Sequence, residues 1–97
     1  MDPGHGTAEL PEGALQLVNT LTHGGGELAL DVMDLPAGRL DVELLSTSGR
    51  RLGAQVLDHA GAAQRYVLAG APQQTGTYAL VVRDAAGRAK SWLFVVK

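Results

Sequence analysis

Apolar and polar residues alternate along several short segments of this chain, and this alternation limits the possible folds more than any other feature. Residues 27–33, 39–46 and 76–84 each carry an apolar residue at every second position. Alternate side chains of a β-strand point to the same face of its sheet, so a period of two predicts strands with one buried face. The apolar residues that alternate in this way are Leu28, Leu30, Val32, Leu40, Val42, Leu44, Tyr78, Leu80 and Val82.

Turn signals separate these segments. Gly38 follows Pro36 ahead of one segment, and Gly49 lies in residues 47–50, a turn short enough to join antiparallel strands. We therefore expect an all-β fold, an immunoglobulin-like antiparallel β-sandwich of about seven strands. The expected strands are residues 14–18, 27–33, 39–46, 51–58, 62–68, 76–84 and 88–97.

The two sheets of a sandwich share one interior, which the alternating leucines and valines should fill. The segments 51–58 and 62–68 add further residues to this set. The residues of these two segments that we expect to point inward are Leu52, Ala54, Val56, Tyr66 and Leu68.

The 97 residues suffice for one small domain. Residues 1–13 contain three glycines and two prolines, which predicts a flexible lead-in or linker. Residues 14–97 are then the β-sandwich domain. The first residues lack the basic start and apolar stretch of a signal peptide, so we expect either a cytosolic protein or a piece of a longer secreted one.

Composition and charge argue against several classes of protein. The formal net charge of −2 disfavours nucleic-acid binding, which usually needs a basic surface. The chain has no cysteine, which excludes disulfides and thiolate metal sites. No apolar run reaches the roughly 20 residues that a transmembrane helix requires, so we expect no membrane insertion.

Candidate catalytic and metal-binding residues are poorly grouped. The three histidines, His5, His23 and His59, are expected in loops and turns exposed to solvent, without a second ligand at a suitable spacing. Ser48 precedes a turn glycine, and turn formation explains it better than nucleophilic catalysis. We expect no catalytic residue, no metal and no cofactor, and we predict that the chain is not an enzyme.

The last two predicted strands are the most informative part of the sequence. Tyr78 follows a glycine near the start of its strand, where sandwiches often place a tyrosine whose hydroxyl binds upstream backbone. Residues 92–96 are apolar at every position. They are either a central strand buried on both faces, or a strand whose second face or edge serves a partner.

Several short motifs recur here in a familiar order. Residues 35–38 read LPAG, residues 48–52 read SGRRL, residues 76–82 read GTYALVV, and the chain closes on FVVK after Gly87. This order resembles the C-terminal sorting domain of proteins exported by the type IX secretion system of Bacteroidetes. The resemblance covers roughly residues 14–97.

The resemblance implies a non-catalytic module that directs a covalently linked upstream cargo across the outer membrane. Its implied partners are the outer-membrane translocon and a sortase-like peptidase. Its implied location is the periplasm in transit, then the cell surface or the medium. The residues that match the signal-bearing pattern are Gly76, Tyr78, Gly87, Phe94, Val95, Val96 and Lys97.

A second hypothesis is an immunoglobulin-like or fibronectin-like module for adhesion or carbohydrate binding. Such a module would use loops or an exposed aromatic platform. The chain has only four aromatic residues, and all four are expected within strands. A small hydrolase is a third and much weaker hypothesis, because no nucleophile has a base nearby in the predicted fold.

Overall fold

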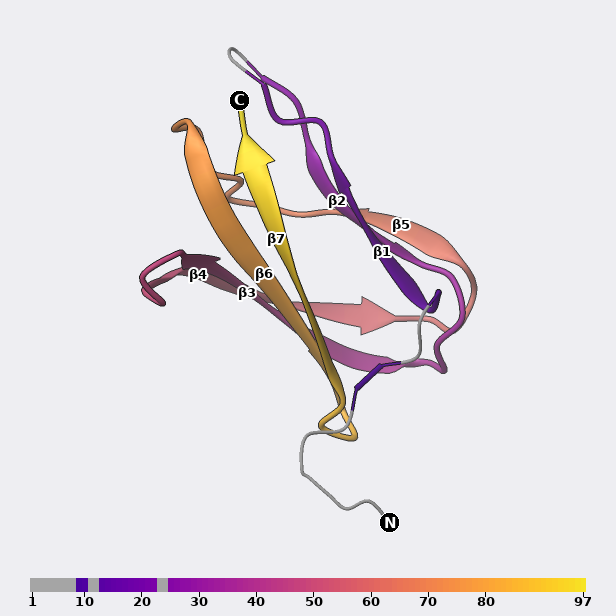
Figure 1. The fold of residues 1–97 in the computed structure, drawn as a ribbon. Helices are drawn as coiled ribbons and strands as arrows, with labels where there is room; N and C mark the ends of the chain where they lie inside the picture. The colour runs from indigo at the N-terminus through magenta and orange to yellow at the C-terminus, as the bar shows by residue number, and fades with distance from the viewer. Residues whose placement is uncertain (1–8, 11–12, 23–24) are drawn as a thin grey trace.

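The computed structural model describes residues 9–10, 13–22 and 25–97 of the chain. These residues form seven strands and no helix (Figure 1). The strands are β1 (Leu15–Asn19), β2 (Leu28–Val32), β3 (Gly38–Ser46), β4 (Arg51–His59), β5 (Gln64–Val67), β6 (Gly76–Asp84) and β7 (Ala89–Val96).

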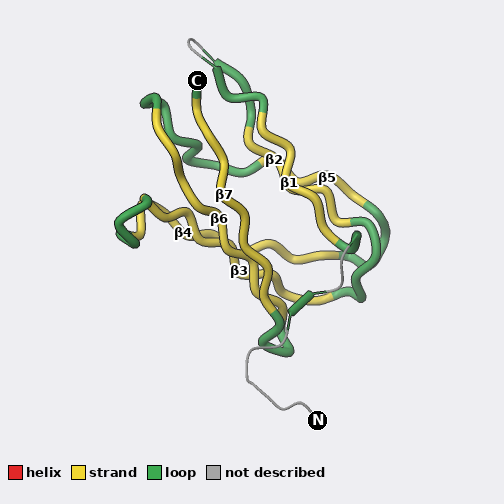
Figure 2. The backbone as a smooth tube through the Cα atoms, in the orientation of Figure 1, coloured by secondary structure: helices red, strands yellow, loops and turns green. Residues whose placement is uncertain are grey.

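The strands form two antiparallel sheets that face each other. The smaller sheet has the order β1-β2-β5, and the larger has the order β4-β3-β6-β7. Figure 2 shows the two sheets and the loops that pass between them. The expected all-β fold, an antiparallel sandwich of about seven strands, is confirmed, and its two sheets are compatible with the immunoglobulin-like form. Because β4 pairs with β3 and not with β5, the sheets divide as three and four strands.

The core lies between the sheets and is filled by the alternating residues. Leu30, Val32 and Val82 are completely shielded from solvent. In the larger sheet, β3 and β6 pair so that Val42 lies opposite Val82 and Leu44 lies opposite Leu80. The other buried apolar residues are Leu10, Ala14, Leu15, Leu21, Leu28, Ala29, Leu35, Leu40, Leu44, Leu68, Leu80, Phe94 and Val96.

The inward face of β4 is the reverse of the predicted one. Leu52 and Val56 are 46% and 51% exposed, and Ala54 is exposed as well. A bulge at the β3–β4 hairpin sets this register, because Leu44 pairs with Gly53 while Leu45 pairs with Arg51. The residues of β4 that face the interior are Gly53, Gln55, Leu57 and His59. The prediction for β5 was correct, since Leu68 is buried and Tyr66 packs against the core.

Amide side chains join the two sheets along both open sides of the sandwich. On one side, Gln55 of β4 donates from Nε2 to the carbonyl of Ala69 at 3.1 Å and accepts from the Ala69 N–H at 3.3 Å. On the other side, Asn19 of β1 donates from Nδ2 to the carbonyl of Val95 at 2.7 Å. Gln55 thus pairs with Ala69 through both of its amide groups, as a strand backbone would, and each amide bridges the two sides where no backbone ladder does so.

His59 is buried, and the expectation of a solvated turn histidine is wrong. It ends β4 on the inward face and is only 4% exposed. Its Nε2 lies 3.2 Å from the carbonyl of Leu35, which can only accept, so Nε2 carries the proton. Its Nδ1 lies within hydrogen-bond distance of the Tyr66 hydroxyl, at 2.9 Å. His59 thus ties β4 to the β2–β3 connection and to β5. His5 and His23 lie outside the described residues.

Part of the expected lead-in, residues 1–13, is described. The side chain of Leu10 is buried in the core. Its N–H donates to the carbonyl of Ala89 at 3.1 Å, and Glu9 forms a parallel bridge with the same residue. Leu10 therefore packs with the sandwich and touches the first residue of β7.

Neither a membrane-spanning helix nor a metal-binding cluster is found in the part of the chain described. Within these residues the structure contains no helix with the length and hydrophobicity that crossing a membrane would need. The same residues hold no group of three or more histidine, aspartate or glutamate side chains placed to bind a metal ion.

Replacement of Leu80 by alanine should destabilise the domain strongly. Leu80 is 1% exposed and lies on the inward face of β6, so its loss leaves a cavity between the sheets. We expect Leu80→Ala to lower the free energy of unfolding by about 2–5 kcal/mol. Urea denaturation measures this change. An unchanged midpoint would contradict the position assigned to Leu80, and Val56→Ala on the exposed face of β4 is the matched control.

Candidate functional site

The C-terminal hairpin, which consists of β6 and β7 together with Lys97, carries the residues that the sequence pattern singled out. β7 is an edge strand, because within the larger sheet it pairs only with β6. Leu93 and Val95 point away from the interior and are 76% and 47% exposed. The interpretation of residues 92–96 as a central strand buried on both faces is therefore wrong. The opposite interpretation of the apolar run, with one face uncovered, matches the observed position of β7.

The inward face of the same strand explains why the run is apolar throughout. Phe94 and Val96 are buried in the core, and Trp92 is half-buried against it. Lys90 places its Nζ 5.7 Å from the centre of the Trp92 ring, within the range of a cation–π contact. The sequence cannot distinguish an apolar face that packs against the core from one that is exposed to solvent, because both consist of apolar residues.

The open edge of β7 has a short stretch of free backbone. The carbonyls of Ala89 and Val95, near the two ends of the strand, are the ones bonded to Leu10 and to the Asn19 side chain. Because backbone groups of alternate residues point to the same side of an antiparallel strand, those of Ser91 point to this edge too. The same holds for Leu93. Neither makes a hydrogen bond on this edge with a described residue.

Asn19 fastens the end of β7 to the smaller sheet. While its Nδ2 binds the Val95 carbonyl, its Oδ1 accepts from the N–H of Leu21 at 2.9 Å. The N–H of Lys97 in turn points to the carbonyl of Leu21, at 3.5 Å. The side chain of Lys97 stays exposed. The sequence analysis missed Asn19, since an asparagine at the end of a predicted strand is equally common in turns.

Four of the singled-out residues meet across the two strands of the hairpin. Gly76 pairs with Val96, and Tyr78 pairs with Phe94. The rings of Tyr78 and Phe94 stack with their centres 5.7 Å apart and their planes at 26°. The Tyr78 hydroxyl donates to the carbonyl of Gln74 at 2.8 Å, which confirms the predicted bond to upstream backbone. This end of the hairpin is thus held by an aromatic pair and an anchored hydroxyl.

Gly87 lies at the opposite end of the hairpin, in the turn between β6 and β7. Its φ of +86° is one that residues with a side chain rarely adopt. Asp84 holds the turn, since its Oδ1 accepts from the N–H groups of Ala86 at 3.1 Å and Arg88 at 2.8 Å. Its Oδ2 accepts from Arg88 Nε at 2.8 Å. The signal pattern therefore maps to two separate ends of the hairpin.

The electrostatics of the turn favour an ionised Asp84. Partial burial alone raises the pKa of this carboxyl, but the hydrogen bonds from the Arg88 side chain and backbone oppose it. The charge of Arg88 and the Ala86 N–H act in the same direction, and the net effect lowers the pKa below its usual value. Elsewhere, the side-chain hydrogen bond from Arg65 lowers the pKa of Asp31 on the exposed face of the smaller sheet.

The two structural glycines outside the hairpin also have defined places. Gly49 has a φ of +88° and donates its N–H to the Ser46 carbonyl at 2.9 Å, closing the predicted turn between β3 and β4. The hydroxyls of Ser46 and Ser48 are 2.8 Å apart in this turn, a pairing that serves the turn itself. Gly38 is the first residue of β3.

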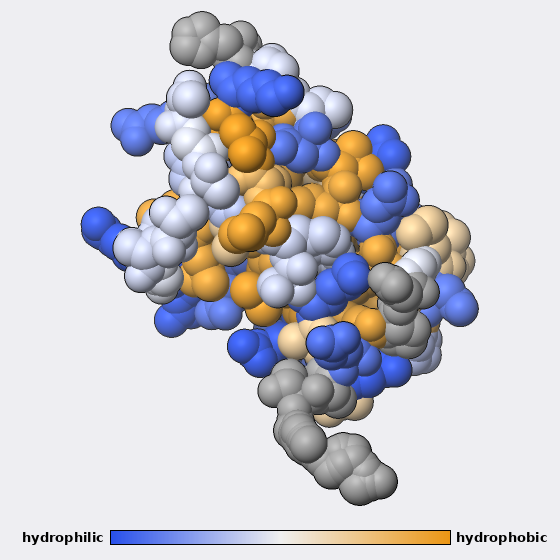
Figure 3. Space-filling view, in the orientation of Figure 1, coloured by the Kyte–Doolittle hydropathy of each residue, from blue (hydrophilic) through white to orange (hydrophobic). Residues whose placement is uncertain are grey.

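The outer face of the larger sheet changes in character from β4 to β7. Ion pairs cover the side of β3 and β4, where Arg39 binds Asp41 at 3.0 Å and Arg51 binds Glu43 at 3.4 Å. On the side of β6 and β7 the residues that share this face are mainly apolar. We call them the outer apolar patch: Leu45, Ala79, Val81, Leu93 and Val95. Figure 3 shows hydrophobic side chains gathered along β7.

Comparison of the chain with protein families, with curated proteins and with solved structures found no match.

Removal of the Tyr78 hydroxyl should weaken the domain without disturbing the aromatic pair. Tyr78→Phe retains the ring that stacks on Phe94 and loses the hydrogen bond to the Gln74 carbonyl. We expect the free energy of unfolding to fall by about 0.5–1.5 kcal/mol. Chemical denaturation measures the difference. A variant as stable as the parent would show that the hydroxyl contributes nothing.

The turn carboxylate should make part of the stability sensitive to acid. The pKa of Asp84 is lowered by folding, so its contribution is present above the pKa of an unfolded aspartate, about 3.9. The contribution disappears as the pH falls through the folded pKa. We expect Asp84→Asn to be less stable than the parent at pH 6, and the difference to shrink below about pH 4. Thermal unfolding across this range measures it, and a difference independent of pH would contradict the prediction.

Proposed function

We propose that this chain is a non-catalytic C-terminal sorting module of the kind used in type IX secretion. It directs an upstream cargo protein through the outer membrane, where the translocon recognises it and a sortase-like peptidase acts on it. The cargo passes through the periplasm and ends at the cell surface or in the medium. The exposed part of the C-terminal hairpin is the surface that the translocon reads.

The observation that carries this proposal is the position of the last strand. A signal at the end of a chain must be folded well enough to have one shape and exposed well enough to be read. β7 meets the first requirement because Phe94 and Val96 are buried and Asn19 holds the carbonyl of Val95. It meets the second because Leu93 and Val95 face solvent, and no described residue pairs with the backbone of Ser91 or Leu93 on this edge. Free edges of this kind are common sites of recognition by added strands.

The order of the sequence motifs supports the same proposal. Gly76, Tyr78 and the residues that close the chain match the signal pattern and also meet across β6 and β7. The adhesion and carbohydrate alternative gains no specific support from the described residues. Their aromatic side chains, Tyr66, Tyr78, Trp92 and Phe94, are half-buried or buried and form no exposed platform.

Export of a reporter tests the proposal. A reporter with a signal peptide is fused ahead of residues 1–97 and expressed in a host that has the type IX system. We expect the reporter to reach the cell surface or the medium, and to stay in the periplasm when Leu93→Ser and Val95→Thr are combined. These two side chains are exposed, so the variant should keep the core and the fold.

The matched control changes the same kinds of residue on the other edge of the sheet. Leu52→Ser with Val56→Thr alters two exposed residues of β4 and should leave export unchanged. Retention of the unmodified fusion in the periplasm would reject the sorting function. Equal export by the β7 and β4 variants would reject β7 as the surface that is read. Circular dichroism of the purified domains checks that both variants fold.

A further inference from the structure

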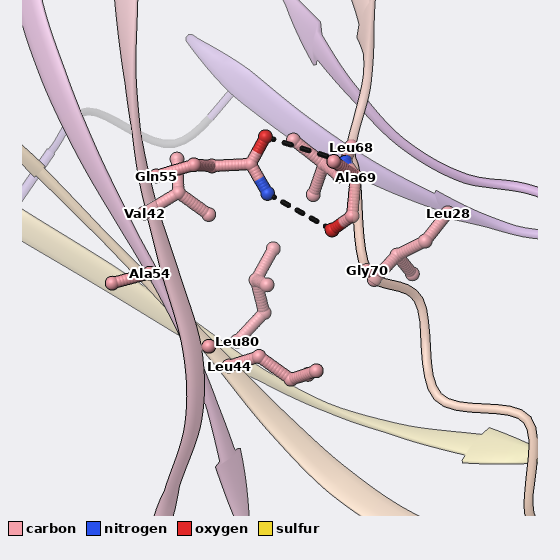
Figure 4. Close-up of a pocket in the computed structure, with 10 residues that line it drawn as sticks. Leu28, Val42, Leu44, Ala54, Gln55, Leu68, Ala69, Gly70 and Leu80 are labelled. Atoms are coloured by element: carbon pink, nitrogen blue, oxygen red, sulfur yellow. Dashed lines mark hydrogen bonds between the residues drawn. The ribbon is translucent and has the colours of Figure 1, made fainter.

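A pocket opens between the two sheets on the side of β4, away from β7. Its volume is about 190 Å³, and its walls are mainly leucine and valine side chains (Figure 4). Leu44, Val42 and Leu80 come from the larger sheet, while Leu28 and Leu68 come from the side of the smaller one. The pocket therefore reaches into the interior of the sandwich, between side chains that form its core.

The pocket exists because an inward position of β4 has no side chain. Gly53 pairs with Leu44, whose side chain is buried, so a larger residue at position 53 would point between the sheets. The backbone does not demand glycine there, since Gly53 is not among the residues with positive φ. A Cβ added at this position would meet no atom within 4 Å. The space next to Gly53 is thus open.

The polar group beside the pocket is already satisfied. Gln55 lies across its upper part in Figure 4, with both ends of its amide bonded to the backbone of Ala69. Among the described residues no buried side-chain nitrogen or oxygen lacks a hydrogen-bond partner. No charged side chain lines the pocket. A sugar, an anion or a cation would find no free partner here and would lose its hydration.

We propose that this pocket is a binding site for a small uncharged apolar molecule, an aromatic ring of roughly benzene to indole size. An engineered apolar cavity of about 150 Å³ in another protein stays dry and binds benzene, so a slightly larger leucine-lined pocket suits such a ring. Apart from Leu80 of β6, its walls lie outside the C-terminal hairpin, and the site does not depend on the proposed sorting function. Binding would cover apolar surface that the missing side chain at position 53 leaves bare.

Toluene, with benzoate as its charged counterpart, tests this site in the full chain. We expect toluene to raise the midpoint of thermal unfolding in a concentration-dependent way, because a ligand that binds only the folded state stabilises it. Toluene should also shift the amide NMR signals of Gly53, Ala69 and Gly70. Benzoate should do neither, since its carboxylate has no partner in the pocket. No effect of toluene up to its solubility limit, or an equal effect of benzoate, would overturn the proposal.

Filling the pocket from position 53 provides the decisive variant. Gly53→Leu should raise the midpoint of unfolding without ligand and weaken toluene binding at least tenfold. Gly53→Ala adds only a Cβ into open space, so it serves as the milder variant if leucine does not fit, and it should weaken binding to a smaller extent. Val56→Leu adds bulk to the exposed face of the same strand, outside the pocket, and should leave binding unchanged. Toluene affinity that is unchanged in the folded Gly53 variants would place the bound toluene elsewhere and refute the site.

Discussion

The antiparallel pairing of β3 with β6 is the contact on which the rest of this structure depends. The two strands are the centre of the larger sheet, and their register matches Val42 with Val82 and Leu44 with Leu80 on one face. These side chains form one wall of the core, and the smaller sheet packs Leu28, Leu30 and Val32 against it. Both edge strands take their orientation from this pair, because β4 pairs with β3 and β7 pairs with β6.

Side-chain hydrogen bonds connect the two sheets where no backbone hydrogen bonds do. A sandwich of separate sheets has two lateral sides along which no backbone ladder runs. In this chain each side is bridged by an amide, Gln55 on one and Asn19 on the other. His59 adds a third link, between β4, the β2–β3 connection and β5. These links fix how the two sheets face each other.

The period-two pattern was enough to predict the class of fold and the approximate bounds of every strand. The bond from the Tyr78 hydroxyl to upstream backbone was predictable from the place of this tyrosine at the start of a sandwich strand, because the bond is local in sequence. The pattern failed in β4, where pairing with the neighbouring strand decides which residues face the interior. In β4, Leu52 and Val56 alternate as well as any core residues do, but a single bulge beside Leu45 turns them outward.

Asn19 and His59 were not predicted from the sequence, and the physical reason is the same for both. Asn19 and His59 act through partners that are 76 and 24 residues away, respectively, and no local pattern encodes such a partner. The pocket could not be predicted either, because a glycine at position 53 indicates an empty space only when that position is known to face the interior. The apolar run in β7 allowed two interpretations, and the order of strands in the sheet decided between them.

The attachment of Leu10 to the first residue of β7 has a mechanical consequence. Leu10 binds at Ala89, and Lys97 lies at the other end of the same strand, as Figure 1 shows for β7. A pull on Lys97 along the axis of β7, with the rest of the domain held in place, loads the ladder between β6 and β7 in shear. Its hydrogen bonds lie across that axis, so they resist together and do not open one after another. Force along this strand therefore meets more resistance than force that peels β7 away from β6 one hydrogen bond at a time.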